Sequence, residues 1–310
     1  MDGGLHERFV NWSAAALAGL SVSACASQPE ATSADIAAGC GAPAGWESIA
    51  EASEHKVLIF GESHGTNEMP DAFARYVCAA SAQGGKTLVL LEIDASYEDT
   101  FSEASDAADP HAVLVTQMPK HWSSTDGRGS VAMLEMVERL IALRQGGRDL
   151  SIRPMDQMTG WPDMKSPEER SAWLASQPPT KAQQMRDAGM AEKIRDESEG
   201  FDRTIVLVGN VHAREAELEV LPGVQLMAML VPDAISLFGI YDGGTSWNSR
   251  DGQGGSVNEM YRLNLIDAPV DAMALTPEKL PAYPGDVPAY DGYFSVGMLS
   301  ASEPVLPPAE

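Results

Sequence analysis

The sequence predicts an α/β fold in which helices cover both faces of a mostly parallel central sheet. Short runs that are apolar throughout alternate along the chain with longer segments of helical periodicity. A strand that is apolar throughout is typically buried on both faces, as the strands of parallel sheets are. The chain has 310 residues, of which 44% are hydrophobic and 21% charged, so it is long enough to bury a substantial core.

The expected strands and helices follow one another in alternation. Apolar runs predict strands at residues 56–60, 87–91, 150–152, 204–208 and 224–231. Helical spacing or a helix start signal predicts helices at residues 69–85, 130–145, 166–177 and 180–198. Ser130 is a favourable N-cap, and Gly146 with Gly147 is a typical helix stop. This alternation indicates parallel strands joined by helical crossovers.

The N-terminal region has the pattern of a bacterial lipoprotein signal peptide. An apolar stretch at residues 14–22, too short to span a bilayer, runs into Ser23, Ala24 and Cys25. We expect residues 1–24 to be removed and Cys25 to be lipidated, with an ordinary cleaved signal as the alternative. The lipid would anchor the protein to a membrane of the bacterial cell envelope, and we expect the outer membrane, with the protein facing the periplasm.

Composition divides the rest of the chain into three parts. Residues 25–45 are rich in Ala, Ser, Gly and Pro and are expected to form a linker. The α/β domain is expected at residues 46–268. Residues 269–310 contain eight of the twenty prolines, so they are expected to form a C-terminal arm with short strands that wraps the domain.

The net charge excludes one class of partner. Lys and Arg number 21 against 45 Asp and Glu, which gives a charge of −24 at pH 7 and a pI of about 4.5. A surface of this sign repels polyanions, so we expect no nucleic-acid partner. The expected ligand is a small molecule or a peptide, and the sequence leaves the oligomeric state open.

Two cysteines remain once Cys25 carries a lipid. In an oxidising compartment, Cys40 and Cys78 are expected to form a disulfide. The alternative is a pair of unrelated buried thiols.

Four predicted strands end in residues that titrate or bind metals. These are Gly61-Glu62-Ser63-His64 after the first strand, Glu92 and Asp94 after the second, Arg153 and Asp156 after the third, and Gly209-Asn210-Val211-His212 after the fourth. Open α/β sheets bind ligands at the C-terminal ends of their strands. Each group alone has a structural alternative, such as a helix cap or a surface ion pair. The two Gly-x-x-His turns, each directly after an apolar strand, favour a functional site.

The residue types at these strand ends suit hydrolysis or metal binding. His64 is a candidate general base, because a nearby carboxylate would orient its ring. His212 and Asn210 are expected to hold the carbonyl or the leaving group, and arginines to stabilise an oxyanion. Alternatively, His64, His212 and Glu62 would hold a divalent metal. The other candidates for substrate contact are Arg128, Arg153, Arg214, Glu68 and Asp156.

These motifs occur in a specific order along the chain. The set runs from Gly61-Glu62-Ser63-His64-Gly65-Thr66-Asn67-Glu68 through Glu92 and Arg186-Asp187-Ala188-Gly189-Met190-Ala191 to Gly209-Asn210-Val211-His212-Ala213. It resembles the superfamily that unites erythromycin esterases, ChaN-type haem-uptake lipoproteins and Tiki/TraB metalloproteases. The resemblance covers about residues 46–240. One departure is Gly209, where the esterase motif has histidine.

Each branch of the superfamily implies a different function. The esterase branch implies that His64 is the base that activates water, with Glu92 and Glu62 as its carboxylate partners. The Tiki branch implies metal-dependent proteolysis at His64 and His212. The ChaN branch implies haem or iron binding without catalysis, for which His121 beside Trp122 is a candidate pair. We therefore expect a hydrolase that cleaves an ester or amide, with the other two functions as alternatives and with divalent metal and haem as the possible cofactors.

Overall fold

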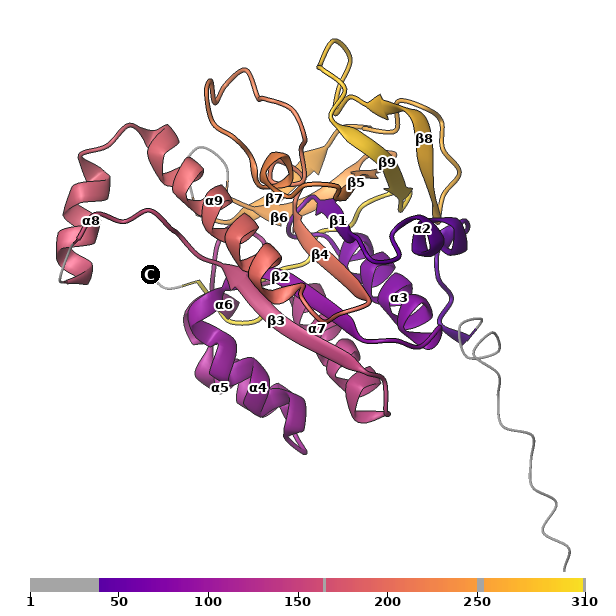
Figure 1. Cartoon of the computed structure of the whole chain (residues 1–310), viewed down its shortest axis with the longest axis horizontal. Coiled ribbons are helices and arrows are strands. Elements are labelled where there is room, and N and C mark those ends of the chain that lie inside the picture. The colour runs from indigo at the N-terminus through magenta and orange to yellow at the C-terminus, as the bar shows by residue number, and fades with distance from the viewer. Residues whose placement is uncertain (1–38, 164–165, 250–253, 309–310) are drawn as a thin grey trace, which may run out of the picture. The chain divides into compact units, whose positions relative to one another are not determined.

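A computed structural model describes residues 39–163, 166–249 and 254–308 (Figure 1). The predicted signal peptide, the lipidation site Cys25 and most of the predicted linker lie outside these residues. None of the described helices is long and apolar enough to cross a membrane.

The centre of the fold is a seven-stranded sheet. Its strand order is β3-β2-β4-β1-β5-β9-β8, and every neighbouring pair is parallel except the edge pair β8 and β9. The strands are β1 Val57–Glu62, β2 Thr87–Asp94, β3 Leu150–Asp156, β4 Arg203–Gly209, β5 Ile235–Ile240, β8 Ala272–Leu280 and β9 Tyr290–Ser295. Strands β6 (Gly244–Asn248) and β7 (Ser256–Met260) form a separate antiparallel pair. The predicted α/β class with a mostly parallel sheet is confirmed.

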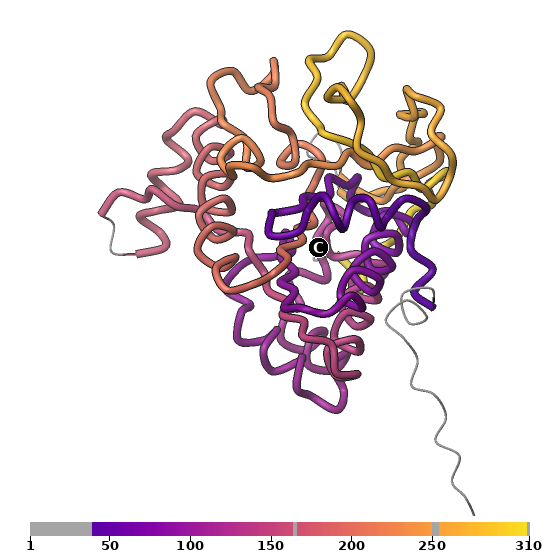
Figure 2. The backbone as a smooth tube through the Cα atoms, turned by 45° about the vertical axis from the view of Figure 1, so that its right-hand side comes forward, coloured from indigo at the N-terminus to yellow at the C-terminus, as the bar shows by residue number. Residues whose placement is uncertain are grey.

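Helices occupy both faces of the sheet, as the uniformly apolar strands predict. The helical elements are α2 Trp46–Ala52, α3 Glu68–Ala82, η1 Ala95–Tyr97, α4 Glu98–Asp106, α5 Pro110–Gln117, α6 Pro119–Trp122, α7 Val131–Gln145, α8 Pro167–Ala175, α9 Pro179–Glu197 and η2 Met227–Leu230. Alternate strand residues face opposite sides. Leu58 and Phe60 pack with α3 and α7 on one side, and Ile59 and Val206 pack with α9 and η2 on the other. In Figure 2 the purple-to-magenta helices α4–α7 lie in the lower part of the view and most of the orange and yellow segments after residue 210 in the upper part.

Local signals explain where two of the helices begin. The Ser130 side chain accepts a hydrogen bond from Met133 N and caps α7. Ser166 and Glu169 form a reciprocal capping box at the start of α8. Helices at these places are expected from the sequence, and both occur.

The prediction for the fifth strand is wrong. Residues 224–231 form irregular chain and the 3-10 helix η2, whereas the fifth strand is β5, which starts four residues later. The apolar residues of η2, Met227 and Ala228, are buried, so the run does face the core. Met, Ala and Leu are not β-branched and have a lower preference for strands than Ile or Val, and Pro232 ends the run before β5 begins at Ile235.

The C-terminal region contributes to the sheet itself. Strand β9 lies between β5 and β8, so the expected domain boundary at residue 268 does not coincide with the end of the sheet. Beyond β9, residues 299–306 run as extended chain across several loops; we call these residues the C-terminal strap. At the other end of the described chain, a disulfide joins Cys40 to Cys78 of α3, with 5.6 Å between the Cα atoms.

Candidate functional site

The strand order brings the two Gly-x-x-His turns together. Strands β1 and β4 are neighbours, and Glu62 at the end of β1 lies opposite Gly209 at the end of β4. Strand β2, which carries Glu92, pairs with the other edge of β4. A cavity of about 610 Å³ lies at these strand ends. Its polar lining includes Glu62, His64, Glu92, Arg128, Arg186, Asn210 and His212.

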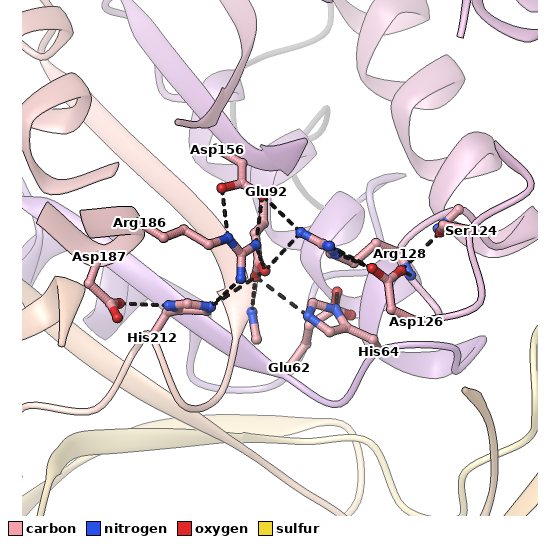
Figure 3. A network of polar contacts seen from close by, with 12 residues as sticks. Glu62, His64, Glu92, Ser124, Asp126, Arg128, Asp156, Arg186, Asp187 and His212 are labelled. Carbon is pink, nitrogen blue, oxygen red and sulfur yellow. Dashed lines mark hydrogen bonds and ion pairs between the residues drawn. The ribbon is translucent and has the colours of Figure 1, made fainter. Parts of the chain in front are cut away.

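His64 is held between two carboxylates (Figure 3). Its Nδ1 lies 2.9 Å from Oε1 of Glu62, and its Nε2 lies 3.5 Å from Oε2 of Glu92. Burial opposes a charge on the ring, but Glu92 and Glu62 outweigh burial and raise the pKa of His64 to about 10. The ring therefore carries two protons at neutral pH.

Glu92 is the centre of the network in Figure 3. Its Oε2 accepts a hydrogen bond of 2.6 Å from the backbone N–H of Gly209. Its Oε1 accepts a bond of 2.5 Å from Arg186 and lies 3.4 Å from Nη1 of Arg128. Burial alone would raise the pKa of Glu92, but the positive charges of His64 and Arg186 hold it well below the usual range. Glu92 is therefore a fixed anion around which the other groups are arranged.

Two arginines form a bridged pair with Asp156. Arg186 donates to both carboxylate oxygens of Asp156, at 2.7 and 2.6 Å, and Arg128 donates to one of them at 2.8 Å. Arg128 also binds Asp126 at 2.9 Å through Nε. Burial lowers the pKa of a guanidinium, but the carboxylates outweigh it and raise the pKa of both arginines. Burial would likewise raise the pKa of Asp126, but Arg128 lowers it to about 2.

His212 forms a second histidine–carboxylate pair. Its Nδ1 lies 2.6 Å from Oδ1 of Asp187, a fully buried residue that Gln183 and the backbone N–H of Met227 also contact. Nη1 of Arg186 lies 3.0 Å from Nε2 of His212. Arginine can only donate, so Nε2 is the acceptor and the proton is on Nδ1. The ring of His212 is therefore neutral and oriented by Asp187.

Gly209 is required at its position for steric reasons. A Cβ atom there would lie 2.7 Å from Nε2 of His64 and 3.5 Å from Oε2 of Glu92. The absence of a side chain lets the ring of His64 approach Glu92 while the N–H of Gly209 binds the same carboxylate. The departure from the esterase motif at this residue thus has a local structural reason.

Most of the predicted site residues meet at this cavity. The members that line it or bind its lining are Glu62, His64, Glu92, Arg128, Asp156, Asn210 and His212. The backbone of Asn210 is fixed by Tyr290, whose hydroxyl donates a hydrogen bond of 2.8 Å to the carbonyl of Asn210.

Three of the predicted residues lie elsewhere. Glu68 accepts hydrogen bonds from the backbone N–H and hydroxyl of Ser300. Arg153 pairs with Glu98 and Glu197 on the surface because its side chain leaves β3 away from the cavity. The third, Arg214, forms a buried ion pair with Asp286. All three have structural partners in place of the predicted contact with substrate.

The haem-side candidate His121 also lies outside the cavity lining. Its ring packs edge-on against buried Trp122 with 4.6 Å between ring centroids. Burial, and then the charge of Arg128, lower the pKa of His121 to about 4.

Three residues of α9 belong to the site although no role is expected for them from the sequence. Gln183, Arg186 and Asp187 are spaced by three and four residues, so they share one face of the helix. Arg186 and Asp187 belong to the motif that carries the superfamily resemblance. The rule that sites lie at the ends of parallel strands does not apply to residues within a helix, so it does not place these two side chains. The helical spacing was the signal that would have found them.

The donor set does not suit a divalent metal. In the described part of the chain, no group of three or more His, Cys, Asp or Glu is arranged to hold a metal ion. Arg128 and Arg186 are hydrogen-bonded to the carboxylates of Glu92 and Asp156, so a dication would meet two positive charges there. A histidine that ligates haem iron needs a ring nitrogen with a free lone pair, but Nε2 of His64 is protonated and Nε2 of His212 accepts from Arg186.

Comparisons with known proteins agree with the resemblance in the sequence. No family model and no curated protein matches the chain. Among solved structures, a variant of the erythromycin esterase EreC in its open conformation matches with a TM-score of 0.57 and 12% identity, covering 82% of this chain and 93% of that chain. A succinoglycan biosynthesis protein matches with a TM-score of 0.58 and 10% identity, covering 83% and 91%. The haem-binding ChaN of Campylobacter jejuni matches with a TM-score of 0.39 and 12% identity, covering 70% and 91%, which is too low for an argument.

The fold and the site define a class of protein. The chain is an α/β protein that shares its fold with the erythromycin esterase EreC, at 12% identity. Its strand ends present a buried network of two histidines, two arginines and several carboxylates to one cavity.

Proposed function

We propose that the protein is a hydrolase that cleaves an ester or amide bond of a small molecule by attack of water. The observation that carries the proposal is the pair of histidine–carboxylate units, His64 with Glu62 and His212 with Asp187, on either side of Glu92 (Figure 3). General acid–base hydrolysis needs one group that gives a proton and one that takes a proton. The two units differ in that respect.

We assign the proton acceptor to His212 and the proton donor to His64. His212 is neutral, and Asp187 fixes its Nδ1 proton, so Nε2 is the basic atom. His64 has a pKa of about 10 and is protonated at neutral pH, which suits donation to the leaving group. This assignment reverses the role that the esterase resemblance implies for His64.

The proposed reaction uses Arg186 as the oxyanion partner. A carbonyl oxygen that approaches Nη1 of Arg186 would take over the N–H that now binds His212, leaving Nε2 to a water molecule. The water oxygen then attacks the carbonyl carbon while His212 accepts its proton. Collapse of the tetrahedral intermediate breaks the bond to the leaving group, which receives a proton from His64. Exchange of one proton with solvent restores both rings.

The charges and the rim of the cavity favour a neutral or cationic substrate with an apolar part. The network contains three cations, His64, Arg128 and Arg186, against the carboxylates of five residues. A net negative site in a protein of charge −24 disfavours anions. Apolar side chains form the other part of the lining: Val211, Leu218, Val220, Leu221 and Met260.

The fold comparison supports the hydrolase class. The EreC structure is described as an erythromycin esterase and shares this fold. At 12% identity the likeness does not extend to the substrate, so erythromycin itself is not proposed.

The first experiment measures hydrolysis of p-nitrophenyl butyrate, a neutral ester, by the purified full chain. We expect His64→Gln and His212→Gln each to lower kcat/KM about 10²–10⁴-fold, because each removes one proton-transfer group. His111→Gln is the matched control, since His111 is an exposed histidine whose ring pairs with Glu138. Mono-(p-nitrophenyl) succinate, which adds a carboxylate to a substrate of similar size, is expected to react more slowly. Equal hydrolysis by the wild type and both site variants would refute the proposal.

We also propose that the mature chain is a lipoprotein of the cell envelope, anchored through Cys25. The support is the apolar stretch before Cys25 in the sequence. Cys25→Ser should abolish labelling by radioactive palmitate and release the protein from the membrane fraction. Unchanged labelling in that variant would disprove the anchor.

A further inference from the structure

The C-terminal strap, residues 299–306, is bound along the loop that carries His64. The backbone N–H of Asn67 donates to the carbonyl of Ser300 at 3.0 Å, and the N–H of Ser302 donates to the carbonyl of Gly65 at 2.9 Å. Glu68 accepts a further hydrogen bond of 2.9 Å from the N–H of Ser300. These bonds fix the backbone on the C-terminal side of His64.

The same strap continues along the loop that carries Arg128. The N–H of Val305 donates to the carbonyl of Gly129 at 3.0 Å, and the N–H of Val131 donates to the carbonyl of Glu303 at 2.9 Å. Further on, the N–H of Leu306 donates to the carbonyl of Trp122 at 2.9 Å. No residue of the strap lines the cavity, so its contact with the site is indirect.

The two loops are in direct backbone contact beneath the strap. A Cβ atom on Gly127 would lie 2.6 Å from the N of Gly65 and 2.8 Å from the carbonyl carbon of His64. This approach is possible only for glycine, and Gly127 also has a positive φ of 84°. Any shift between the loops therefore changes the positions of His64 and Arg128 relative to each other.

Ser302 of the strap binds both the His64 loop and the start of the helix that follows the Arg128 loop. Its N–H donates to Gly65, while its Oγ accepts a hydrogen bond of 3.0 Å from the N–H of Ala132, at the start of α7 and just after the Arg128 loop. Ser302 is buried, so water does not replace these bonds readily. We propose that the C-terminal strap positions His64 and Arg128 in the site, and that Ser302 is the positioning residue that joins their two loops.

The proposal goes beyond hydrolysis, because it concerns the geometry on which any chemistry at this site depends. His64 faces Glu92 at 3.5 Å and Arg128 faces it at 3.4 Å, and these separations are sensitive to small shifts of the loops. A loosened strap would move His64 away from Glu92 and weaken the attraction between them. The titration of His64 reports on that separation directly.

The experiment follows the His64 ring proton resonances by NMR from pH 6 to pH 11 in the full chain. His64→Gln identifies the resonances. In Ser302→Ala we expect the titration midpoint to fall by about one pH unit or more, the change that a weakened carboxylate neighbour produces. Ser256→Ala, which alters an exposed serine of β7, is the control and should leave the midpoint unchanged.

A second pair of variants removes the strap. One chain ends after Leu299 and lacks most of the strap, and the other ends after Leu306 and keeps it. We expect a lower midpoint only in the shorter chain. If that chain fails to fold, as judged by circular dichroism, Ser302→Ala alone decides. A folded Ser302→Ala variant with an unchanged His64 midpoint would overturn the proposal, whether or not the protein hydrolyses esters.

Discussion

The protonated state of His64 makes the stability of the protein depend on alkaline pH. The surroundings of His64 raise its pKa from the usual 6.5 to about 10, so the folded protein holds this proton more tightly than the unfolded chain does. The resulting stabilisation is fully present below pH 6.5 and is lost as the pH rises towards 10. Replacing His64 with Gln removes the titrating group and so removes this dependence.

The expected magnitude follows from the size of the shift. Each pH unit between the two pKa values corresponds to about 1.4 kcal/mol, which gives a total of about 5 kcal/mol as an upper value. The ring is 20% exposed, and solvent screening reduces the effect. We therefore expect the wild type to lose about 1 kcal/mol of stability per pH unit relative to His64→Gln between pH 7 and pH 9.

Urea unfolding at half-unit steps from pH 6 to pH 10 measures this difference. The free energy of unfolding of each protein is obtained by linear extrapolation, and the difference between the two is plotted against pH. The variant loses other interactions as well, so the slope of the difference and not its absolute value is the test. Parallel pH profiles for the two proteins would refute a protonated His64.

Two more predictions concern single positions. Gly209→Ala places a methyl group 2.7 Å from Nε2 of His64, so we expect the free energy of unfolding in urea to fall by about 1–3 kcal/mol and ester hydrolysis to slow. The control Gly254→Ala, which has open space around it, should change neither quantity. Wild-type behaviour of Gly209→Ala would show that His64 does not lie against this glycine. Peptide mapping without reductant should find Cys40 and Cys78 in one cross-linked pair of peptides. Because the bond closes a loop of 38 residues, Cys78→Ala should lower the free energy of unfolding by about 3–4 kcal/mol. Alkylation of both thiols in the unreduced protein would disprove the bond.

The parts of the fold that follow local rules were predictable from the sequence. Apolar strands such as residues 204–208 and capped helices such as that after Ser130 depend on short-range signals. The run at residues 224–231 was misassigned because burial makes a 3-10 segment as apolar as a strand. The place of β9 within the sheet was also hidden, since its burial alternates and many prolines surround it.

The site shows the same division. Glu62, His64, Glu92, Asn210 and His212 were predictable because each lies at or just after the end of a parallel strand. Arg153 was misplaced because β3 continues to Asp156, so Arg153 lies in the middle of the strand and its side chain leaves the sheet away from the cavity. Asp187 and Arg186 come from a helix, whose rotation against the sheet is set by the packing of Met190, Ala191 and Ile194. No local signal encodes that rotation.

The order of the charged residues along the chain constrains how the protein folds. Glu62 and Glu92 are separated in sequence from Arg186, and the segment that binds the His64 and Arg128 loops together comes more than a hundred residues after both. Before α9 docks, burial of Glu92 would leave its negative charge without the hydrogen bond from Arg186. We therefore expect the strand ends to stay hydrated until α9 docks, after the rest of the sheet has collapsed.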